Sequence, residues 1–250
     1  MAKTALAVLE AALRDRKLDR TLTTALPPLE RSDAAALIST DVTALDRCLR
    51  GGLPRGQLSE LTGPRSAGRT TVLLQVLAAA TRRGEVVALV DTFDRLDVAS
   101  AVAAGVDLDR LLWIRGAAIS RTESMDELRD RTLDRAVKAL NLVLQAGGFG
   151  VVAIDLADVP LLALKRLPFT TWLRVQRSIE GSDTACLLVA PEPLARSAGG
   201  LTLTLTARPT WAGTADRSRR FGGLALTMRV VSPRRRVDGE VGVEAVAHDG

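Results

Sequence analysis

The sequence is poor in the residues on which several kinds of chemistry depend. Among its 250 residues there is no tyrosine, aromatic residues make up 3%, histidine occurs once and cysteine twice. A single histidine, His248, excludes a Ser-His-Asp triad, a Cys-His pair and a multi-histidine metal centre. Cys48 and Cys186 are far apart and form no CxxC pair, so we expect neither a disulfide framework nor a structural zinc site. The shortage of aromatics also disfavours a base-stacking platform for single strands.

Long apolar runs are missing as well. Hydrophobic residues make up 47% and charged residues 25% of the chain, but no run approaches the roughly 18 residues of a membrane-spanning helix. Near the start, Glu10 and the charged residues 14–17 interrupt the apolar stretch that a signal peptide would need. We therefore expect a cytoplasmic, nucleoid-associated protein with no membrane partner.

Positive charge is concentrated in one region. The net charge is +5, yet the seven arginines between positions 217 and 236 exceed that total, and no acid lies among them. Such a cluster can neutralise DNA phosphates or meet an acidic protein partner, and it can also be the charged edge strand that prevents aggregation. The candidate patch for DNA or an acidic partner consists of Arg217, Arg219, Arg220, Arg234, Arg235 and Arg236.

The first residues form a separate pattern. Residues 4–18 have leucines at roughly helical spacing with charges between them, which predicts an amphipathic helix. Residues 21–33 include Pro27-Pro28 and have little periodicity, which is typical of a linker. The helix either binds a partner or folds back on its own core. Its candidate partner-binding residues are Leu6, Leu9, Leu13 and Leu18.

The middle of the chain alternates strands with helices. A short strand at 58–62, a glycine-containing turn, a helix at 69–82 and a strand at 86–90 form a βαβ unit. The sequence also predicts the strands 112–114, 151–154 and 185–190 and the helices 123–145 and 170–180. This order predicts an α/β fold with a mostly parallel sheet between helices.

The last part of the chain changes pattern. Residues 201–206 alternate strictly between leucine and threonine, and 224–231 and 241–247 also have strand character. We expect an antiparallel C-terminal edge on the sheet. The predicted organisation is therefore a helical arm with its linker at 1–33, a core at 34–232 and a short basic and acidic tail at 233–250.

The sharpest motif is the segment GPRSAGRTT, which follows a predicted strand and opens a predicted helix, as a phosphate loop does. In such a loop backbone N–H groups surround phosphate oxygens, a lysine contacts the β and γ phosphates, and a hydroxyl binds Mg²⁺. Thr70 supplies the hydroxyl, but Arg69 replaces the lysine with a bulkier, planar guanidinium. The alternative is a plain glycine turn. The candidate nucleotide-binding residues are Gly63, Pro64, Arg65, Ser66, Ala67, Gly68, Arg69, Thr70 and Thr71.

A second part of such a site is a carboxylate at the end of a neighbouring strand. Asp155 directly follows the predicted strand 151–154, so Thr70 and Asp155 are the candidate magnesium residues. The alternative for Asp155 is to cap the segment that follows it. We expect no required cofactor, with ATP and Mg²⁺ as the alternative.

Several motifs in order and spacing resemble the core of the RecA recombinase family. They are LDRCLRGGLPRGQ at 45–57, the phosphate loop, and AGVDLDRLL at 104–112, and the resemblance extends from residue 41 to about 207. The combination is far more specific than any one motif. The resemblance implies a RecA-like core and, in the recombinases themselves, an ATP-driven filament on DNA.

The departures from the recombinase pattern concern ATP hydrolysis, nucleotide binding and DNA binding. Phe93 stands where the recombinases have the glutamate that activates water, and Asp94 could replace it only after a register shift. The aromatic that stacks on adenine would fall near Ser100. The segments 156–160 and 191–200, which match the two DNA-binding loops, are short. We therefore expect a protein that is not an enzyme.

Within this family, a shortened chain with an amphipathic first helix is similar to the ImuA accessory proteins of bacterial translesion-synthesis cassettes. That resemblance implies a role in SOS mutagenesis, with an ImuB-like inactive Y-family polymerase protein and RecA itself as partners. A DNA-stimulated ATPase, a DNA-binding protein that needs no nucleotide, and a regulator of the circadian or cell-division type on the same fold are the alternatives.

Overall fold

The computed structural model describes residues 36–116, 125–195, 200–213, 219–231 and 240–246. The chain divides into two units, residues 1–33 and 34–250. The predicted helix at 4–18, with Leu6, Leu9, Leu13 and Leu18, lies outside the described residues, as do four of the clustered arginines. Those four are Arg217, Arg234, Arg235 and Arg236.

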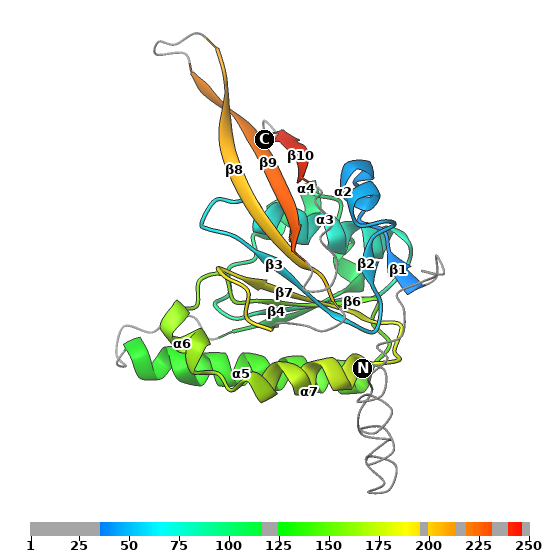
Figure 1. The fold of residues 1–250 in the computed structure, drawn as a ribbon, viewed down its shortest axis with the longest axis vertical. Coiled ribbons are helices and arrows are strands. Elements are labelled where there is room, and N and C mark those ends of the chain that lie inside the picture. The colour runs from blue at the N-terminus through cyan, green and yellow to red at the C-terminus, as the bar shows by residue number, and fades with distance from the viewer. Residues whose placement is uncertain (1–35, 117–124, 196–199, 214–218, 232–239, 247–250) are drawn as a thin grey trace, which may run out of the picture. The chain divides into compact units, whose positions relative to one another are not determined.

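The second unit is built on one twisted sheet of eight strands (Figure 1). Six neighbouring strands are parallel, and two antiparallel strands extend the sheet at one edge. In spatial order the strands are β10 (Glu240–Val246), β9 (Arg220–Val231), β8 (Thr202–Ala212), β3 (Leu58–Thr62), β7 (Ala185–Ala190), β6 (Val151–Asp155), β4 (Val87–Asp91) and β5 (Leu111–Arg115). The α/β class, the mostly parallel sheet and the antiparallel C-terminal edge are therefore confirmed.

Helices cover both faces of the sheet and divide the core into two layers. The side chains of β4 alternate between them: Val87 and Leu89 pack with the cluster that includes helix α3, whereas Ala88 and Val90 pack with the cluster that includes helix α5. This alternation is the period of two that any strand imposes. One layer has α2 (Thr43–Cys48), α3 (Arg69–Arg82) and α4 (Val98–Ala103), and the other has α5 (Met125–Ala146), α6 (Leu161–Arg166) and α7 (Phe169–Ile179).

The predicted strands at 58–62 and 185–190 and the predicted helix at 69–82 have the bounds that the structure gives them. The short elements β1 (Leu37–Ile38), β2 (Leu53–Pro54) and the 3-10 turn η2 (Leu108–Arg110) were not predicted, because two or three residues carry no periodic pattern. The antiparallel strands β8 and β9 are longer than their alternating stretches and form a ribbon that projects from the sheet (Figure 1).

Where the chain is described, no helix combines the length and the apolar character needed to cross a bilayer.

Candidate functional site

The phosphate-loop segment connects β3 to α3 and lies directly against the C-terminal ribbon. Gly63 has φ of 152°, and a Cβ there would come within 2.4 Å of the Leu205 carbonyl oxygen on β8. Gly68 has φ of 83°, and its Cβ would come within 2.2 Å of the Leu226 side chain on β9. Both positions therefore require glycine for backbone conformation and for space. The loop has the turn that a phosphate loop needs, and packing on β8 and β9 holds it in place.

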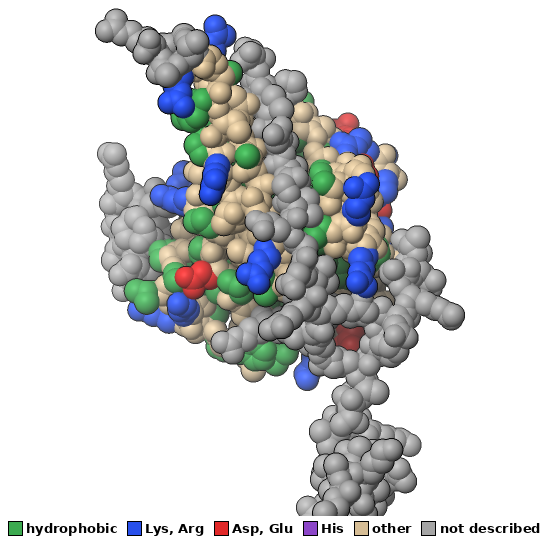
Figure 2. All heavy atoms as spheres, turned by 45° about the horizontal axis from the view of Figure 1, so that its top comes forward, with side chains coloured by type: hydrophobic (Ala, Val, Ile, Leu, Met, Phe, Trp, Pro, Cys, Tyr) green, Lys and Arg blue, Asp and Glu red, His purple; other side chains and the backbone are tan. Residues whose placement is uncertain are grey.

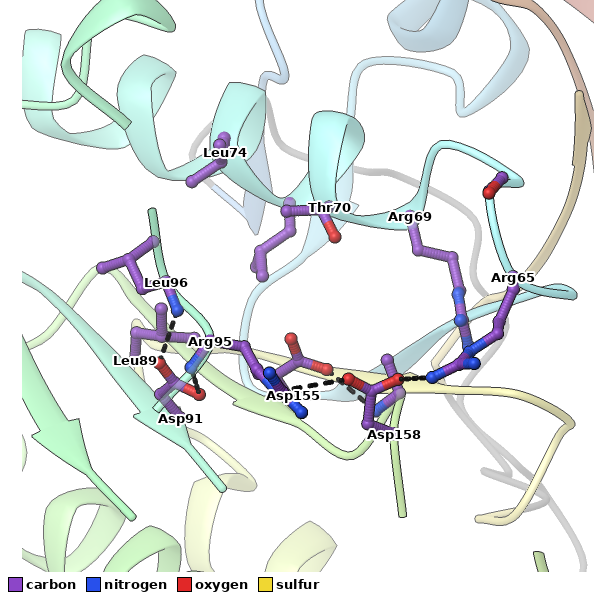
Figure 3. A pocket seen from close by; sticks show the side chains of 13 residues that line it. Arg65, Arg69, Thr70, Leu74, Leu89, Asp91, Arg95, Leu96, Asp155 and Asp158 are labelled. Carbon is purple, nitrogen blue, oxygen red and sulfur yellow. Dashed lines mark hydrogen bonds and ion pairs between the residues drawn. The ribbon is translucent and has the colours of Figure 1, made fainter. Parts of the chain in front are cut away.

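A cavity of about 430 Å³ lies between this loop and the carboxyl ends of the parallel strands (Figure 3). The predicted residues Arg65, Ser66, Arg69, Thr70 and Asp155 all line it. This is the edge of an open α/β sheet at which ligands bind. Sequence reasoning missed three further lining residues with charged side chains, which are Asp91, Arg95 and Asp158.

Arg69 is the first residue of α3, and its side chain is 7% exposed. Its Nη1 atom is buried and has no hydrogen-bond partner among the described residues. Burial lowers the pKa of this guanidinium, and the negative charges of Asp155 and Asp158 act against that shift. Arg69 thus places a buried positive charge where a phosphate loop has its lysine, with carboxylates of its own chain as the nearest compensating charges.

Asp155 is the last residue of β6 and lies opposite Asp91 of β4 in the parallel register. Its Oδ1 accepts a hydrogen bond from the backbone N–H of Ala157 at 2.8 Å, so the capping role considered for it is present. The pKa of Asp155 is raised to about 6, mainly by burial and also by the charge of Asp91, although the Ala157 hydrogen bond and Arg69 act to lower it. A carboxyl group with this pKa is mostly charged at pH 7 and becomes protonated as the pH falls below about 6.

Asp91 fixes the chain that follows β4. Its carboxylate accepts hydrogen bonds from the backbone N–H groups of Arg95 (2.8 Å) and Leu96 (2.7 Å) and from the indole Nε1 of Trp113 (3.2 Å). The side chain is 2% exposed. Three donors on a buried carboxylate make Asp91 an anchor for the turn after β4.

That turn directs its middle residues away from the cavity. Phe93 is 9% exposed and packs in the core layer beneath α5. Asp94 has φ of 57° and accepts two hydrogen bonds of 2.7 Å from Arg115, from Nε and from Nη2. Neither residue lines the cavity. The position expected to hold the water-activating glutamate thus contributes only a packed aromatic ring.

Ion pairs join the two sides of the cavity (Figure 3). Nη2 of Arg65, on the loop, lies 3.1 Å from Oδ1 of Asp158, which follows β6. Nε of Arg95 lies 3.6 Å from Oδ2 of the same aspartate. The side chains are exposed by 85% for Arg65 and 61% for Arg95, so each pair adds little stability. They do direct both guanidinium groups to a protein carboxylate.

The short segment after β7 is fixed from inside the sheet by Glu60. This fully buried carboxylate accepts hydrogen bonds from the backbone N–H groups of Leu194 (2.6 Å) and Ala195 (2.7 Å) and from the Thr202 hydroxyl (3.1 Å). In the recombinase resemblance this segment matches a DNA-binding loop. Here the hydrogen bonds from Leu194 and Ala195 to Glu60 hold the described start of this segment close to the sheet.

Of the predicted arginine patch, Arg219 and Arg220 are described, and both lie at the distal end of the projecting ribbon. There the exposed rings of Trp211 and Phe221 form a cross-strand pair, with ring centroids 6.0 Å apart and perpendicular planes. The Arg219 guanidinium lies 5.6 Å from the Trp211 ring centroid. Basic and hydrophobic side chains follow one another along this ribbon (Figure 2). The aromatic pair was missed, because single aromatics in an alternating strand give no signal of their own.

The residues around the cavity match a magnesium nucleotide in part. Thr70 and Asp155 offer oxygen ligands of the kind that Mg²⁺ prefers. In place of the lysine of a phosphate loop, Arg69 offers a buried guanidinium whose Nη1 has no hydrogen-bond partner among the described residues. Arg65, by contrast, is paired with Asp158.

Comparison with known proteins agrees with the fold. A model of the RecA N-terminal domain matches residues 14–155. The chain is 38% identical over 120 residues to protein RecA of Symbiobacterium thermophilum, covering 48% of this chain and 30% of that protein. It is 41% identical over 118 residues to protein RecA of Nostoc punctiforme, covering 47% of this chain and 29% of that protein. It is 32% identical over 167 residues to protein RecA of Chlorobium chlorochromatii, covering 61% of this chain and 43% of that protein. The alignments thus span less than half the length of these curated relatives.

Proposed function

Because the chain belongs to the RecA N-terminal domain family, we propose that it is a non-catalytic, RecA-like accessory protein of the DNA-damage (SOS) response. In this function it supports translesion synthesis by binding an ImuB-like, inactive Y-family polymerase protein. It also binds RecA and inhibits it. The proposed place of action is the nucleoid in the cytoplasm.

The observation that carries the proposal is the placement of Arg69, Phe93 and Asp94 in and around the phosphate-loop cavity. A RecA-like ATPase needs a cation for the phosphates and a carboxylate for the attacking water. Here Arg69 is buried beside Asp155, Phe93 is packed beneath α5, and Asp94 is held by Arg115. These three positions support a binding role for the fold rather than an ATPase role.

A test of the non-catalytic role uses Thr70→Ala and Arg69→Ala. In a strain from which the gene has been deleted, both variants should restore ultraviolet-induced mutagenesis to the level of the unmodified chain. The purified protein should release no phosphate from MgATP, with or without single-stranded DNA. DNA-stimulated phosphate release that is lost on Asp155→Asn would instead make the protein an ATPase.

The proposed partners require a direct measurement. Titrating the purified chain into a RecA filament on single-stranded DNA should reduce RecA's own ATP hydrolysis at stoichiometric ratios. Co-purification with an ImuB-like protein should give a complex that survives gel filtration. An unchanged RecA rate and separate elution of the two proteins would contradict the adaptor role.

A second candidate, DNA binding without nucleotide, is supported by the distal ribbon. Trp211, Phe221, Arg219 and Arg220 combine exposed aromatic rings with guanidinium groups, which is a composition that suits both single-stranded DNA and protein contacts. DNA contact through this ribbon is compatible with the adaptor role, since the ribbon projects from the sheet (Figure 1).

A further inference from the structure

Helices α5, α6 and α7 cover the face of the sheet opposite to α3, and α5 and α7 pack side by side there (Figure 1). Their outer surface, which we call the α5–α7 face, carries large apolar side chains in contact with water. Leu162 is 75% exposed, Leu142 67%, Phe169 49% and Leu173 41%. Single exposed leucines are ordinary, but four large apolar side chains on one helical layer are the composition of a contact surface.

Helix α7 packs on the sheet through side chains other than Phe169 and Leu173. Its inner side is already occupied by Trp172, Val175 and Ile179, which are at most 3% exposed and anchor the helix to the sheet. Phe169 and Leu173 lie one turn apart on another side of the helix. The helix therefore has a second apolar stripe that the described fold leaves about half exposed.

The same helices carry exposed cations. They include Arg135 and Lys138 on α5, Lys165 on α6, and Arg174 and Arg177 on α7. Residues 131–146 of α5 contain one acid, Asp134, and Lys165 is paired with Glu192 at 3.5 Å. On α7, Arg174 and Arg177 follow Leu173 closely, and the helix itself contains no acid.

We infer that the α5–α7 face is the docking site for an acidic amphipathic helix of a protein partner. A helix with leucine or phenylalanine on one stripe would place these side chains against Phe169 and Leu173. Glutamates and aspartates flanking that stripe would meet Arg174, Arg177 and Lys138. This inference deepens the proposed adaptor function by naming the chemical class of a segment that the adaptor holds.

Two other occupants fit this face less well. A nucleic acid backbone would use the cations but would leave the apolar stripe in water. The predicted helix at 4–18 of a second copy has three cations and two acids, so it offers a basic face no complementary charge. An acidic amphipathic helix satisfies both properties of the surface.

The test is a selection from displayed helical peptides against the full chain. The peptides share an apolar stripe at i, i+3, i+4 and i+7, and their flanking positions are randomised among Glu, Gln and Lys. We expect glutamate to be enriched and the selected peptides to bind with a micromolar Kd. Arg174→Glu with Arg177→Glu, and separately Leu173→Asp, should each weaken binding at least tenfold.

Two matched controls should leave the Kd unchanged: the double variant Arg219→Glu with Arg220→Glu on the ribbon, and Val98→Asp on α4. Circular dichroism checks that every variant is folded. Enrichment of lysine, or binding that the α5–α7 substitutions do not change, would overturn the inference. So would a dimer that Leu173→Asp dissociates, or Leu173-dependent binding to phosphatidylglycerol vesicles. The selection involves neither RecA nor nucleotide, so its failure is distinguishable from failure of the proposed function.

Discussion

Arg65 of the phosphate loop is joined to Asp158, the third residue after β6, by a contact of 3.1 Å between Nη2 and Oδ1. The pair crosses the cavity that the loop and the strand ends enclose. Asp158 also lies 3.6 Å from Arg95. One aspartate therefore holds two guanidinium groups that would otherwise be available to an anion.

Replacing Asp158 with asparagine should raise the affinity of the cavity for inorganic pyrophosphate. An exposed pair is worth about 0.2–1 kcal/mol, so release of both arginines predicts a gain of about threefold. Calorimetry at low ionic strength measures it, with Asp109→Asn on η2 as the control for a lost surface acid. Equal pyrophosphate binding by both variants would show that Asp158 does not neutralise this site.

Arg69→Lys should restore MgATP binding without restoring hydrolysis. A lysine is a compact point charge that can contact the β and γ phosphates, and one hydrogen bond to a charged group contributes about 1.5–3 kcal/mol. We expect MgATP affinity to rise at least tenfold in calorimetry. Phosphate release should stay at background, because Phe93 and Asp94 point away from the cavity. Turnover by this variant would reveal a catalytic carboxylate elsewhere.

The raised pKa of Asp155 predicts a pH dependence of stability. A carboxyl group whose folded pKa is about 6, against 3.8 for the ordinary group, favours the unfolded state once it ionises. That destabilisation grows as the pH rises from about 4 to above 6 and amounts to about 3 kcal/mol when complete. Asp155→Asn keeps an acceptor for the Ala157 N–H and removes the charge.

The stability gained by Asp155→Asn should therefore increase by about 1 kcal/mol between pH 5 and pH 7. Urea unfolding of both proteins at pH 5, 6, 7 and 8 in EDTA measures this difference. A gain that does not depend on pH would mean that Asp155 is ionised throughout this range, held by Arg69.

Periodicity predicted the strands of the sheet and the long helices that cover it. Each of these elements has a hydrophobic pattern that extends over five or more residues. The helix at 69–82 and the strand at 185–190 are examples. The contents of the cavity depend instead on register and on turns. Asp91 and Asp155 lie opposite one another because β4 pairs with β6 in this register. Phe93 packs into the core within a turn whose later backbone N–H groups, those of Arg95 and Leu96, bind the Asp91 carboxylate.

The role of Asp158 could not be predicted from the spacing of residues along the sequence. It stands three residues after the strand-end Asp155, so a second acid near the phosphate loop was visible in the sequence. Its pairing with Arg65 depends on two loops meeting in space, which no local pattern encodes. The same holds for Glu60. Its position within a short strand did not predict that it binds the backbone N–H groups of Leu194 and Ala195.

Glu60→Leu should destabilise the fold strongly. The substitution leaves the buried N–H groups of Leu194 and Ala195 without an acceptor, and each unsatisfied group costs about 1–3 kcal/mol. We expect a loss of about 2–5 kcal/mol in urea unfolding. Glu60→Gln keeps one acceptor oxygen and should lose less. Equal losses for the two variants would mean that volume, not hydrogen bonding, matters at this position.

The distal ribbon can be tested by the salt dependence of its binding to a single-stranded oligonucleotide. Each cation that neutralises a phosphate contributes about 0.7 to the slope of log K against log salt on single strands. Arg219→Ala with Arg220→Ala should therefore reduce the slope by about 1.4, measured by fluorescence anisotropy at three salt concentrations. Arg174→Ala with Arg177→Ala, on the α5–α7 face, removes the same charge from another surface and should leave the slope unchanged. If both pairs of substitutions reduce the slope equally, the protein holds DNA by its overall charge. If neither pair changes the slope, the ribbon arginines contact a protein partner instead. Exposed guanidinium groups beside Trp211 and Phe221 suit an acidic protein surface equally well.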